Sequence, residues 1–162
     1  MNSFKLSIIT PVYNNLECTK IFVSEVTKNT VSDYELIVIN NNSTDGTCEY
    51  LKTIENLKNI IIIDNKKNMG FSHANNQGID IADSKYVCFL NNDVLLYPGW
   101  DLDLIKPFNI YDNIGATGPV TNNCAGIQSE DYGLKNISSE SYRAIAGLRS
   151  KKLNKNYREC HR

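Results

Sequence analysis

The sequence predicts an α/β protein with a mostly parallel sheet and helices on both faces. Short runs rich in Ile, Val and Leu alternate along the chain with longer amphipathic stretches. The runs are apolar throughout rather than alternating with polar residues, which is typical of strands that are buried on both faces. Most of them end abruptly in Asn, Asp or Thr. These patterns favour a Rossmann-like succession of strands and crossover helices.

The first predicted strand covers residues 6–10. We expect Pro11 to end it, because proline has no amide hydrogen to donate to a ladder. A helix is predicted next, over residues 16–29. Its apolar residues recur with helical spacing on one face: Ile21, Phe22 and Val26.

The second predicted strand covers residues 35–39 and stops at the three asparagines of residues 40–42. Ser43 or Thr44 is expected to cap the helix that follows, since a hydroxyl can accept a hydrogen bond from the first turn. This helix runs to about Glu55.

The third strand, residues 60–63, consists of four isoleucines and should be apolar on both faces. The predicted third helix covers residues 70–82, and the fourth strand covers residues 86–90. A further helix is expected around residues 99–108. Residues 115–118 are a possible fifth strand.

Charge is distributed unevenly along the chain. The 162 residues suit one domain with its own core, and a net charge of −1 does not demand a nucleic acid partner. Residues 1–134 carry 9 basic and 16 acidic residues, whereas residues 135–162 carry 8 and 2. This basic tail lacks apolar periodicity, so we expect it to be poorly packed, with peripheral contact to an anionic membrane as a further possibility.

The five cysteines are dispersed and form no C-x-x-C or Cys/His cluster. This usage suits a reducing compartment better than a disulfide scaffold or a zinc site. Cys88 lies in an apolar run and is expected to be an ordinary core residue. No apolar run approaches the roughly 20 residues of a membrane span, and the N-terminus enters a strand without a signal peptide. We therefore expect a soluble cytoplasmic protein.

Several familiar catalytic motifs are absent. The chain has no G-x-G-x-x-G after the first strand, no phosphate-binding loop of the GK[ST] type and no G-x-S-x-G. His73 and His161 are its only histidines, and His73 is expected to be a packing or solvent-facing residue. The chemistry should therefore lie at the strand ends.

Four polar strand ends are predicted to form one cleft. They are residues 10–14, residues 40–42, residues 64–65 and residues 91–93. In parallel sheets ligands bind beyond the carboxyl ends of the strands. The sequence thus predicts a cleft that is lined with hydrogen-bonding groups and two acids.

Five segments carry a resemblance to a known family. They are SIITPVYNN (7–15), ELIVINNNSTDGT (35–47), NMGFSHANNQGI (68–79), YVCFLNNDVLLYPGW (86–100) and GATGPVTNNCAGIQ (115–128). In order and separation they resemble the donor-binding N-terminal portion of a family 2 glycosyltransferase of the GT-A (nucleotide-diphospho-sugar transferase) fold, in its rhamnosyltransferase-like members. The resemblance implies a nucleotide-sugar-binding domain over residues 1–128. Residues 129–162 would be a basic tail that leads into an acceptor-binding half.

The resemblance implies that Thr10, Pro11 and Tyr13 pack on the nucleobase and ribose. The alternative for Tyr13 is a plain turn residue. The family usually has Asp at the end of the second strand, where this chain has Asn40. An amide both donates and accepts, so it can still recognise uracil or thymine. The next polar residues are expected to serve the turn and the helix cap: Asn41, Asn42 and Asp45.

The other nucleotide-sugar-binding residues that the resemblance implies are Asn65, Gly70, Asn75, Asn91 and Asn92. Gly70 would let the backbone approach the ligand closely, because glycine has no side chain. Asn75 would point into the cleft, while Asn76 and Gln77 would face solvent.

Asp93 stands at the D-x-D position, where the family holds Mn²⁺ or Mg²⁺ against the donor's diphosphate. One carboxylate is enough if the diphosphate supplies the remaining oxygen ligands. Asn91 would hydrogen-bond the sugar or ribose. The alternative is that the Asn-Asn-Asp segment is only a turn.

The resemblance therefore implies a glycosyltransferase, or the donor-binding part of one. It would transfer a sugar from a UDP- or dTDP-linked donor to a hydroxyl of a glycan or lipid-linked acceptor, with inversion, in polysaccharide assembly. The catalytic residue is unknown, and we expect the general base beyond Arg162. The alternatives are a non-catalytic nucleotide-sugar-binding module and a nucleotidyltransferase. A nucleotidyltransferase would require a basic, glycine-rich loop after the first strand, and residues 12–15 are not such a loop.

Overall fold

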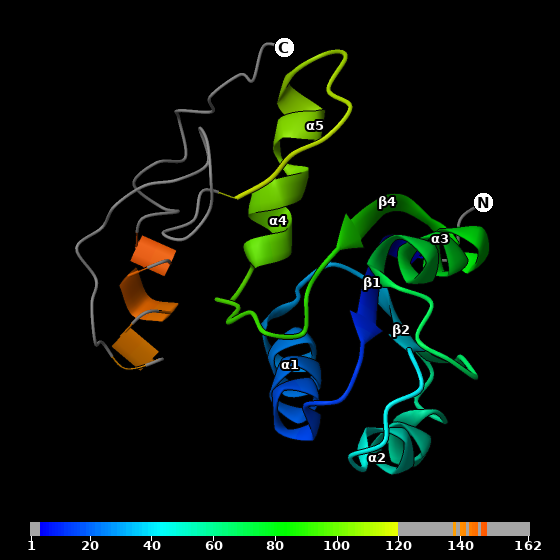
Figure 1. Ribbon diagram of the computed structural model, residues 1–162. Helices are drawn as coiled ribbons and strands as arrows, with labels where there is room; N and C mark the ends of the chain where they lie inside the picture. The colour runs from blue at the N-terminus through cyan, green and yellow to red at the C-terminus, as the bar shows by residue number, and fades with distance from the viewer. Residues whose placement is uncertain (1–3, 120–137, 139, 142, 146, 149–162) are drawn as a thin grey trace. The chain divides into compact units, whose positions relative to one another are not determined.

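The computed structural model describes residues 4–119 and, further along the chain, residues 138, 140–141, 143–145 and 147–148 (Figure 1). The strands are β1 (Phe4–Val12), β2 (Tyr34–Asn40), β3 (Ile60–Asp64) and β4 (Ser84–Phe89). The helices are α1 (Leu16–Asn29), α2 (Thr47–Ile54), α3 (Phe71–Ile81), α4 (Trp100–Ile105) and α5 (Pro107–Ile110). The chain divides into two compact units, Met1–Val94 and Leu95–Arg162, and each is described by itself.

The first unit is built on a four-stranded sheet in the order β3-β2-β1-β4, in which every neighbouring pair is parallel. Helix α3 covers one face, and α1 and α2 lie on the other (Figure 1). This arrangement confirms the mostly parallel sheet with helices on both faces. It also explains why the central strands are apolar throughout, since each must bury side chains on two sides.

The core under α3 depends on one close contact. Ile9, Ile37, Ile39 and Ala74 form a buried cluster between the sheet and this helix. A Cβ added at Gly78 would lie 2.4 Å from Cγ2 of Ile9, so only glycine allows α3 to approach the sheet this closely.

Strand β1 continues through Pro11, contrary to the expectation that this proline ends it. The Ile9 carbonyl accepts a hydrogen bond from the Leu90 amide, and the Val12 carbonyl accepts one from the Asn41 amide. Since alternate residues of a strand direct their polar groups to opposite sides, Pro11 faces the β4 side. The β4 ladder has already ended there, so the missing amide hydrogen costs no bond.

Three other predictions for secondary structure were wrong in detail. Helix α2 begins at Thr47, so neither Ser43 nor Thr44 caps it. The predicted helix over residues 99–108 is split into α4 and α5, because Pro107 starts a new helix in the first position, where no amide hydrogen is needed. Residues 115–118 form no strand, and the Thr117 hydroxyl instead donates to the Leu104 carbonyl at 2.8 Å.

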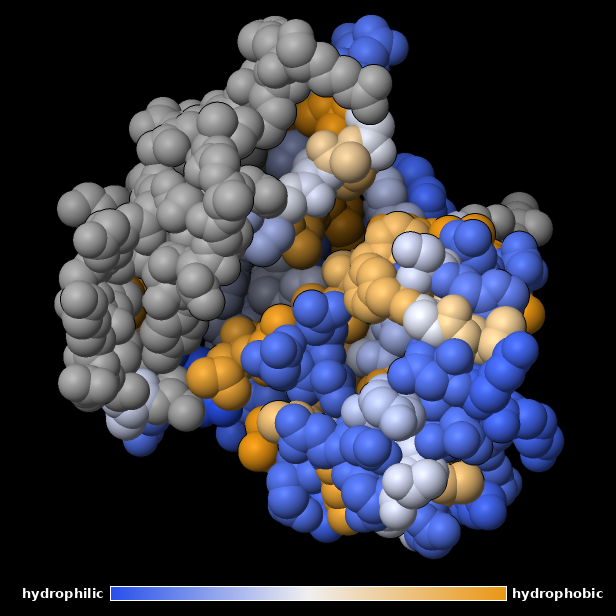
Figure 2. All heavy atoms as spheres, viewed as in Figure 1, coloured by the Kyte–Doolittle hydropathy of each residue, from blue (hydrophilic) through white to orange (hydrophobic). Residues whose placement is uncertain are grey.

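In the described part of the chain, β3 and β4 are the edge strands. Cys88 is consequently only half-buried, and Ile61 is 36% exposed, so the expectations of a core cysteine and a doubly buried third strand hold only in part. On the face that α3 covers, Val87 and Phe89 remain 44% and 52% exposed. Figure 2 shows hydrophobic surface over α3 and β4.

The predicted boundary at residue 128 and most of the basic tail lie outside the described residues. Within the tail, residues 140–141, 143–145 and 147–148 are helical. That the tail is poorly packed stays a prediction. None of the helices in the described residues is long and apolar enough to cross a membrane.

Candidate nucleotide-sugar site

The polar strand ends converge on one edge of the sheet, as predicted. Val12 at the end of β1 is level with Asn40 of β2, and Asn40 is level with Asp64 of β3. Strand β4 ends at Phe89, one strand over from Ile9, so residues 91–93 follow at the same edge. This edge is where ligands bind in open α/β sheets.

Asn40 uses both groups of its amide inside the protein. It is 2% exposed; its Nδ2 donates to Oδ1 of Asp64 at 2.7 Å, and its Oδ1 accepts from the Ser43 amide at 3.0 Å. Asp64, by contrast, is exposed, and its other oxygen has a weak contact with the Cys48 thiol at 3.9 Å. The acid that is open at this corner is therefore Asp64. Asp64 is one of the predicted polar strand ends, but the family resemblance implies no role for it.

A network of side-chain amides holds the loop between β3 and α3. Asn65 Nδ2 donates to Asn41 Oδ1 at 2.9 Å and to Gln77 Oε1 at 2.8 Å, and Gln77 Nε2 donates back to Asn65 Oδ1 at 2.9 Å. The prediction that Gln77 faces solvent is wrong, because α3 turns it toward the end of β3. In this network Asn65 and Asn41, which is 4% exposed, position the loop. Asn76 is exposed, as predicted.

The loops after β1 and β2 are tied to each other. The Asn14 amide donates to the Ser43 hydroxyl at 2.8 Å, and the Thr44 amide donates to Asn14 Oδ1 at 2.8 Å. Asn14 and Asn42 have positive φ angles of 56° and 66°, a conformation that asparagine tolerates better than most residues. This tie fixes the backbone next to Tyr13, which is 54% exposed at the open edge.

Asp45 serves the first turns of two helices. Its Oδ2 accepts from the amide of Leu16 at the start of α1 at 2.9 Å, and its Oδ1 accepts from the amide and hydroxyl of Thr47 at the start of α2 at 3.1 and 2.6 Å. The hydrogen bond from the Thr47 side chain holds the pKa of Asp45 below its usual value, since it stabilises the carboxylate. The prediction of a turn and cap role for Asp45 is confirmed.

Thr10 lies inside the fold rather than at an open surface. It is fully buried, and its hydroxyl donates to the Leu90 carbonyl at 2.8 Å. This bond continues the connection between β1 and β4 beyond the end of the ladder. Pro11, one residue further, is half-buried.

The Asn-Asn-Asp segment combines an anchored residue with two open ones. Asn92 is half-buried, and its Nδ2 donates to the Thr19 hydroxyl of α1 at 3.1 Å. Asn91 and Asp93 are exposed on either side of it. No three His, Cys, Asp or Glu side chains of the described residues are grouped so that they could hold a metal ion. One carboxylate with amide oxygens fits a hard cation only where the ligand supplies further oxygens.

Gly70 and Asn75 belong to the first two turns of α3. Gly70 has a φ of 80°, and a Cβ placed there would meet nothing within 4 Å. Asn75 is 7% exposed, and its Nδ2 donates to the Phe71 carbonyl at 3.0 Å. Within the described part of the chain its Oδ1 has no hydrogen-bond partner. His73 is exposed, in agreement with a solvent-facing role.

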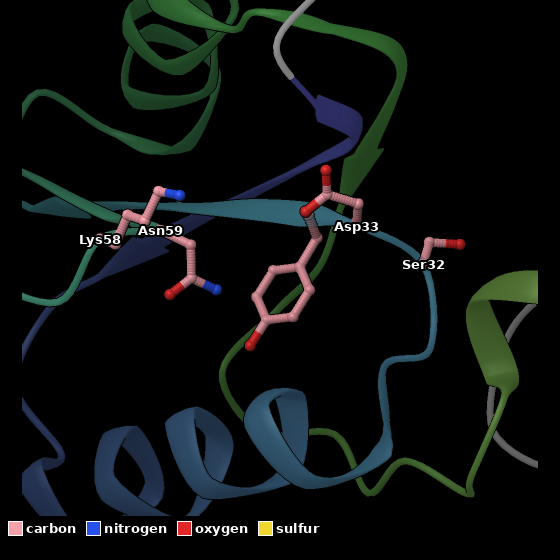
Figure 3. Close-up of a pocket in the computed structure, with 5 residues that line it drawn as sticks. Ser32, Asp33, Lys58 and Asn59 are labelled. Carbon is pink, nitrogen blue, oxygen red and sulfur yellow. The ribbon is translucent and has the colours of Figure 1, made fainter.

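A separate shallow hollow lies at the opposite edge of the sheet. Its lining residues precede β2 and β3: Ser32, Asp33, Tyr34, Lys58 and Asn59 (Figure 3). The amino ends of parallel strands are not where such sheets bind ligands. This hollow is therefore distinct from the candidate site.

The fold and its polar edge define a domain of the nucleotide-diphospho-sugar transferase class. The chain belongs to glycosyl transferase family 2, whose model matches residues 7–158. It is 33% identical over 114 residues to an uncharacterized glycosyltransferase of Haemophilus influenzae, an alignment that covers 70% of this chain and 35% of that protein. The resemblance inferred from the five sequence segments is thus confirmed.

Solved structures share the fold. The TarS fragment 1–349 of S. aureus in complex with UDP superposes with a TM-score of 0.58 at 18% identity, covering 72% of this chain and 39% of that one. The mannosyltransferase PcManGT of Pyrobaculum calidifontis in complex with GDP-Man and Mn²⁺ gives a TM-score of 0.54 at 20% identity, covering 60% and 30%. These likenesses establish the GT-A fold. The chain spans about a third of the length of these relatives.

Proposed function

We propose that this chain binds a nucleoside-diphosphate sugar at the carboxyl edge of its sheet and provides the donor side of a glycosyl transfer to a hydroxyl. The observation that carries this proposal is the grouping of an exposed aromatic ring, Tyr13, with two exposed carboxylates, Asp64 and Asp93, along one edge of a GT-A sheet. The ring of Tyr13 can stack on a base, and the carboxylate of Asp64 can accept a hydrogen bond from the polar edge of that base. The carboxylate of Asp93 can hold a cation against a diphosphate.

The base lies on the half of the edge formed by β1, β2 and β3. Tyr13 offers a ring for stacking, which contributes about 1–3 kcal/mol per base in single-stranded nucleic acid complexes, and the half-buried Pro11 would contact the base or ribose. Asp64 accepts a hydrogen bond from an N–H on the base, while Asn40 holds the carboxylate in place. Uracil, thymine and guanine carry a ring N–H on this edge, whereas cytosine has none in its ring there and offers only its exocyclic amino group.

The diphosphate lies on the half formed by β4 and α3. Asp93 would hold Mn²⁺ or Mg²⁺ there, with the exposed Asn91 available to the sugar or ribose and Asn92 anchoring the turn to α1. When bound, the ion would neutralise negative charge on the leaving nucleoside diphosphate. Gly70 leaves room for the donor to approach the start of α3. That a relative binds Mn²⁺ with GDP-Man supports this assignment.

None of the residues assigned here is a general base. Direct displacement inverts the anomeric carbon and needs a base at the acceptor hydroxyl, a group that contributes about 10²–10⁴ in rate. We propose that this base, and most of the site for a glycan or lipid-linked acceptor, are formed by residues other than those assigned here. A cytoplasmic site of action in polysaccharide assembly is part of the same proposal.

Titration calorimetry with UDP, dTDP and GDP, with and without Mn²⁺, tests donor binding. We expect at least one of these nucleotides to bind, more tightly with Mn²⁺, and little or no transfer of sugar from its sugar conjugate by the 162-residue chain. No binding of any of them would refute the proposal. Robust transfer to a defined acceptor would show that the base is within the chain and would exclude a module that only binds.

A further inference from the structure

Asn75 presents an unusual buried acceptor. Its side chain is 7% exposed, and its Nδ2 is fixed on the Phe71 carbonyl, so the orientation of the amide is determined. Its Oδ1 is buried and has no hydrogen-bond partner among the residues that the structure describes. Leaving a buried polar group unpaired costs about 1–3 kcal/mol, and such a group in a native fold calls for an explanation.

The helix geometry places this acceptor beside the end of β4. Gly78 of α3 lies directly over Ile9 of β1, and Gln77 reaches across to Asn65 after β3. Successive helical residues are rotated by about 100°, so Asn75 points to the side opposite Gln77, toward β4. Phe89 is level with Ile9 and is the neighbouring β4 residue on that face.

Asp93 follows Phe89 by four residues. The free oxygen of Asn75 is therefore on the side of α3 where the diphosphate and sugar lie in the proposed function. A phosphate oxygen cannot satisfy it, because an acceptor needs a donor. A sugar hydroxyl is a donor.

We propose that Asn75 Oδ1 accepts a hydrogen bond from a hydroxyl of the donor sugar, which makes Asn75 a residue that distinguishes a sugar nucleotide from a free nucleoside diphosphate. This inference rests on the proposed function. The Oδ1 of Asn75 then lacks a partner in the free protein, which costs stability, and it gains one when the donor binds.

The decisive variant is Asn75→Leu, which has a similar volume and no acceptor. It removes the unpaired oxygen and the bond to the Phe71 carbonyl, which also accepts the helical hydrogen bond from residue 75. We expect the melting temperature of the free protein to stay the same or rise. The affinity for UDP-GlcNAc or GDP-mannose, whichever the wild type binds, should fall about three- to tenfold, while that for UDP or GDP stays unchanged.

Two further variants and one set of substrate analogues make this result specific. Asn76→Leu is the matched control, since Asn76 is its exposed neighbour on α3, and it should leave the affinity ratio of sugar nucleotide to free nucleotide unaltered. Asn75→Ala should lower the same ratio without a gain in stability. Deoxyfluoro sugar nucleotides, in which fluorine replaces one hydroxyl at a time, then identify the hydroxyl that Asn75 binds. The analogue that lacks this hydroxyl should bind more weakly than the normal donor to the wild type, but no more weakly than the normal donor to Asn75→Leu.

Each outcome separates the two proposals. Failure of the wild type to bind any nucleotide would overturn the proposed function itself. Normal binding of UDP or GDP with an unchanged ratio in Asn75→Leu would overturn the inference alone. An equal loss for free nucleotide and sugar nucleotide would also overturn it, because the acceptor would then serve the ribose or the metal ion. A lower melting temperature with an unchanged ratio would show that Asn75 is structural.

Discussion

Asn40 donates a hydrogen bond from its Nδ2 to Oδ1 of Asp64 at 2.7 Å across the carboxyl ends of two adjacent strands. This bond joins a buried amide to an exposed carboxylate, so the negative charge at this corner lies on β3 while the end of β2 is neutral. The expectation from the family pattern was that Asn40 itself would read the base. Asn40 is buried and both ends of its amide have partners within the protein, which makes Asp64 the better candidate.

Replacing Asp64 by Asn should alter base selectivity. The amide can still accept from Asn40 but can no longer offer a charged acceptor to a base N–H, and hydrogen bonds to charged groups contribute about 1.5–3 kcal/mol. We expect calorimetry to show that the affinity for UDP or GDP falls about tenfold. The affinity for CDP should rise relative to the affinity for UDP or GDP. The double variant Asn40→Asp with Asp64→Asn restores the charge one strand away and should recover part of the affinity. Unchanged selectivity in Asp64→Asn would exclude Asp64 from the base site.

Asp93→Asn should nearly abolish the metal dependence of nucleotide binding. It removes the acid of the Asn-Asn-Asp segment, and a hard cation then has only neutral oxygens from the protein. Asn91→Asp should do the reverse and strengthen Mn²⁺ binding without nucleotide, because two carboxylates would face the ion. Titration of the three proteins with Mn²⁺, with and without UDP, measures both effects. If Asp93→Asn keeps metal-dependent UDP binding, this strand end is only a turn.

Asp45→Ala should destabilise the protein in a pH-dependent way. The pKa of Asp45 is lowered on folding, mainly by the Thr47 side chain, so the carboxylate stabilises the fold above the unfolded pKa of about 3.9. That contribution is lost as the pH falls through the lower folded pKa. Thermal unfolding followed by circular dichroism should therefore show a lower melting temperature for Asp45→Ala at pH 7 and a smaller difference from the wild type near pH 3. A difference that does not change with pH would argue against a role for the charge.

Gly78→Ala should destabilise the first unit by overpacking. The added Cβ would lie 2.4 Å from Cγ2 of Ile9, and such insertions into a packed core cost about 1–3 kcal/mol. Denaturant titration gives the free energy of unfolding directly. Gly115→Ala is the control, because a Cβ there meets nothing within 4 Å, and it should change stability by much less. Equal stability of Gly78→Ala and the wild type would mean that α3 can move away from the sheet at little cost.

The sequence by itself determined the architecture of the first unit. The apolar runs of β1 to β4 and the helical spacing in α1 are local patterns, and each depends on residues a few positions apart. Once those strands are parallel, their polar ends must meet at one edge. The convergence of residues 10–14, 40–42, 64–65 and 91–93 was therefore predictable before any contact was known.

Only the tertiary structure decided which of these polar groups are open to a ligand. Asn40, Asn65 and Asn75 are the same residue type in the sequence, but their side chains differ in the fold. Asn40 is paired with Asp64, 24 positions away, and with the Ser43 amide, while Asn65 is paired with Gln77, 12 positions away. Asn75 keeps a buried oxygen that has no partner in the part of the chain that the structure describes. Hydrogen-bond partners depend on which strands and helix turns become neighbours in space, and no local spacing records that. The same reason explains why Gln77 was expected in solvent but lies against Asn65.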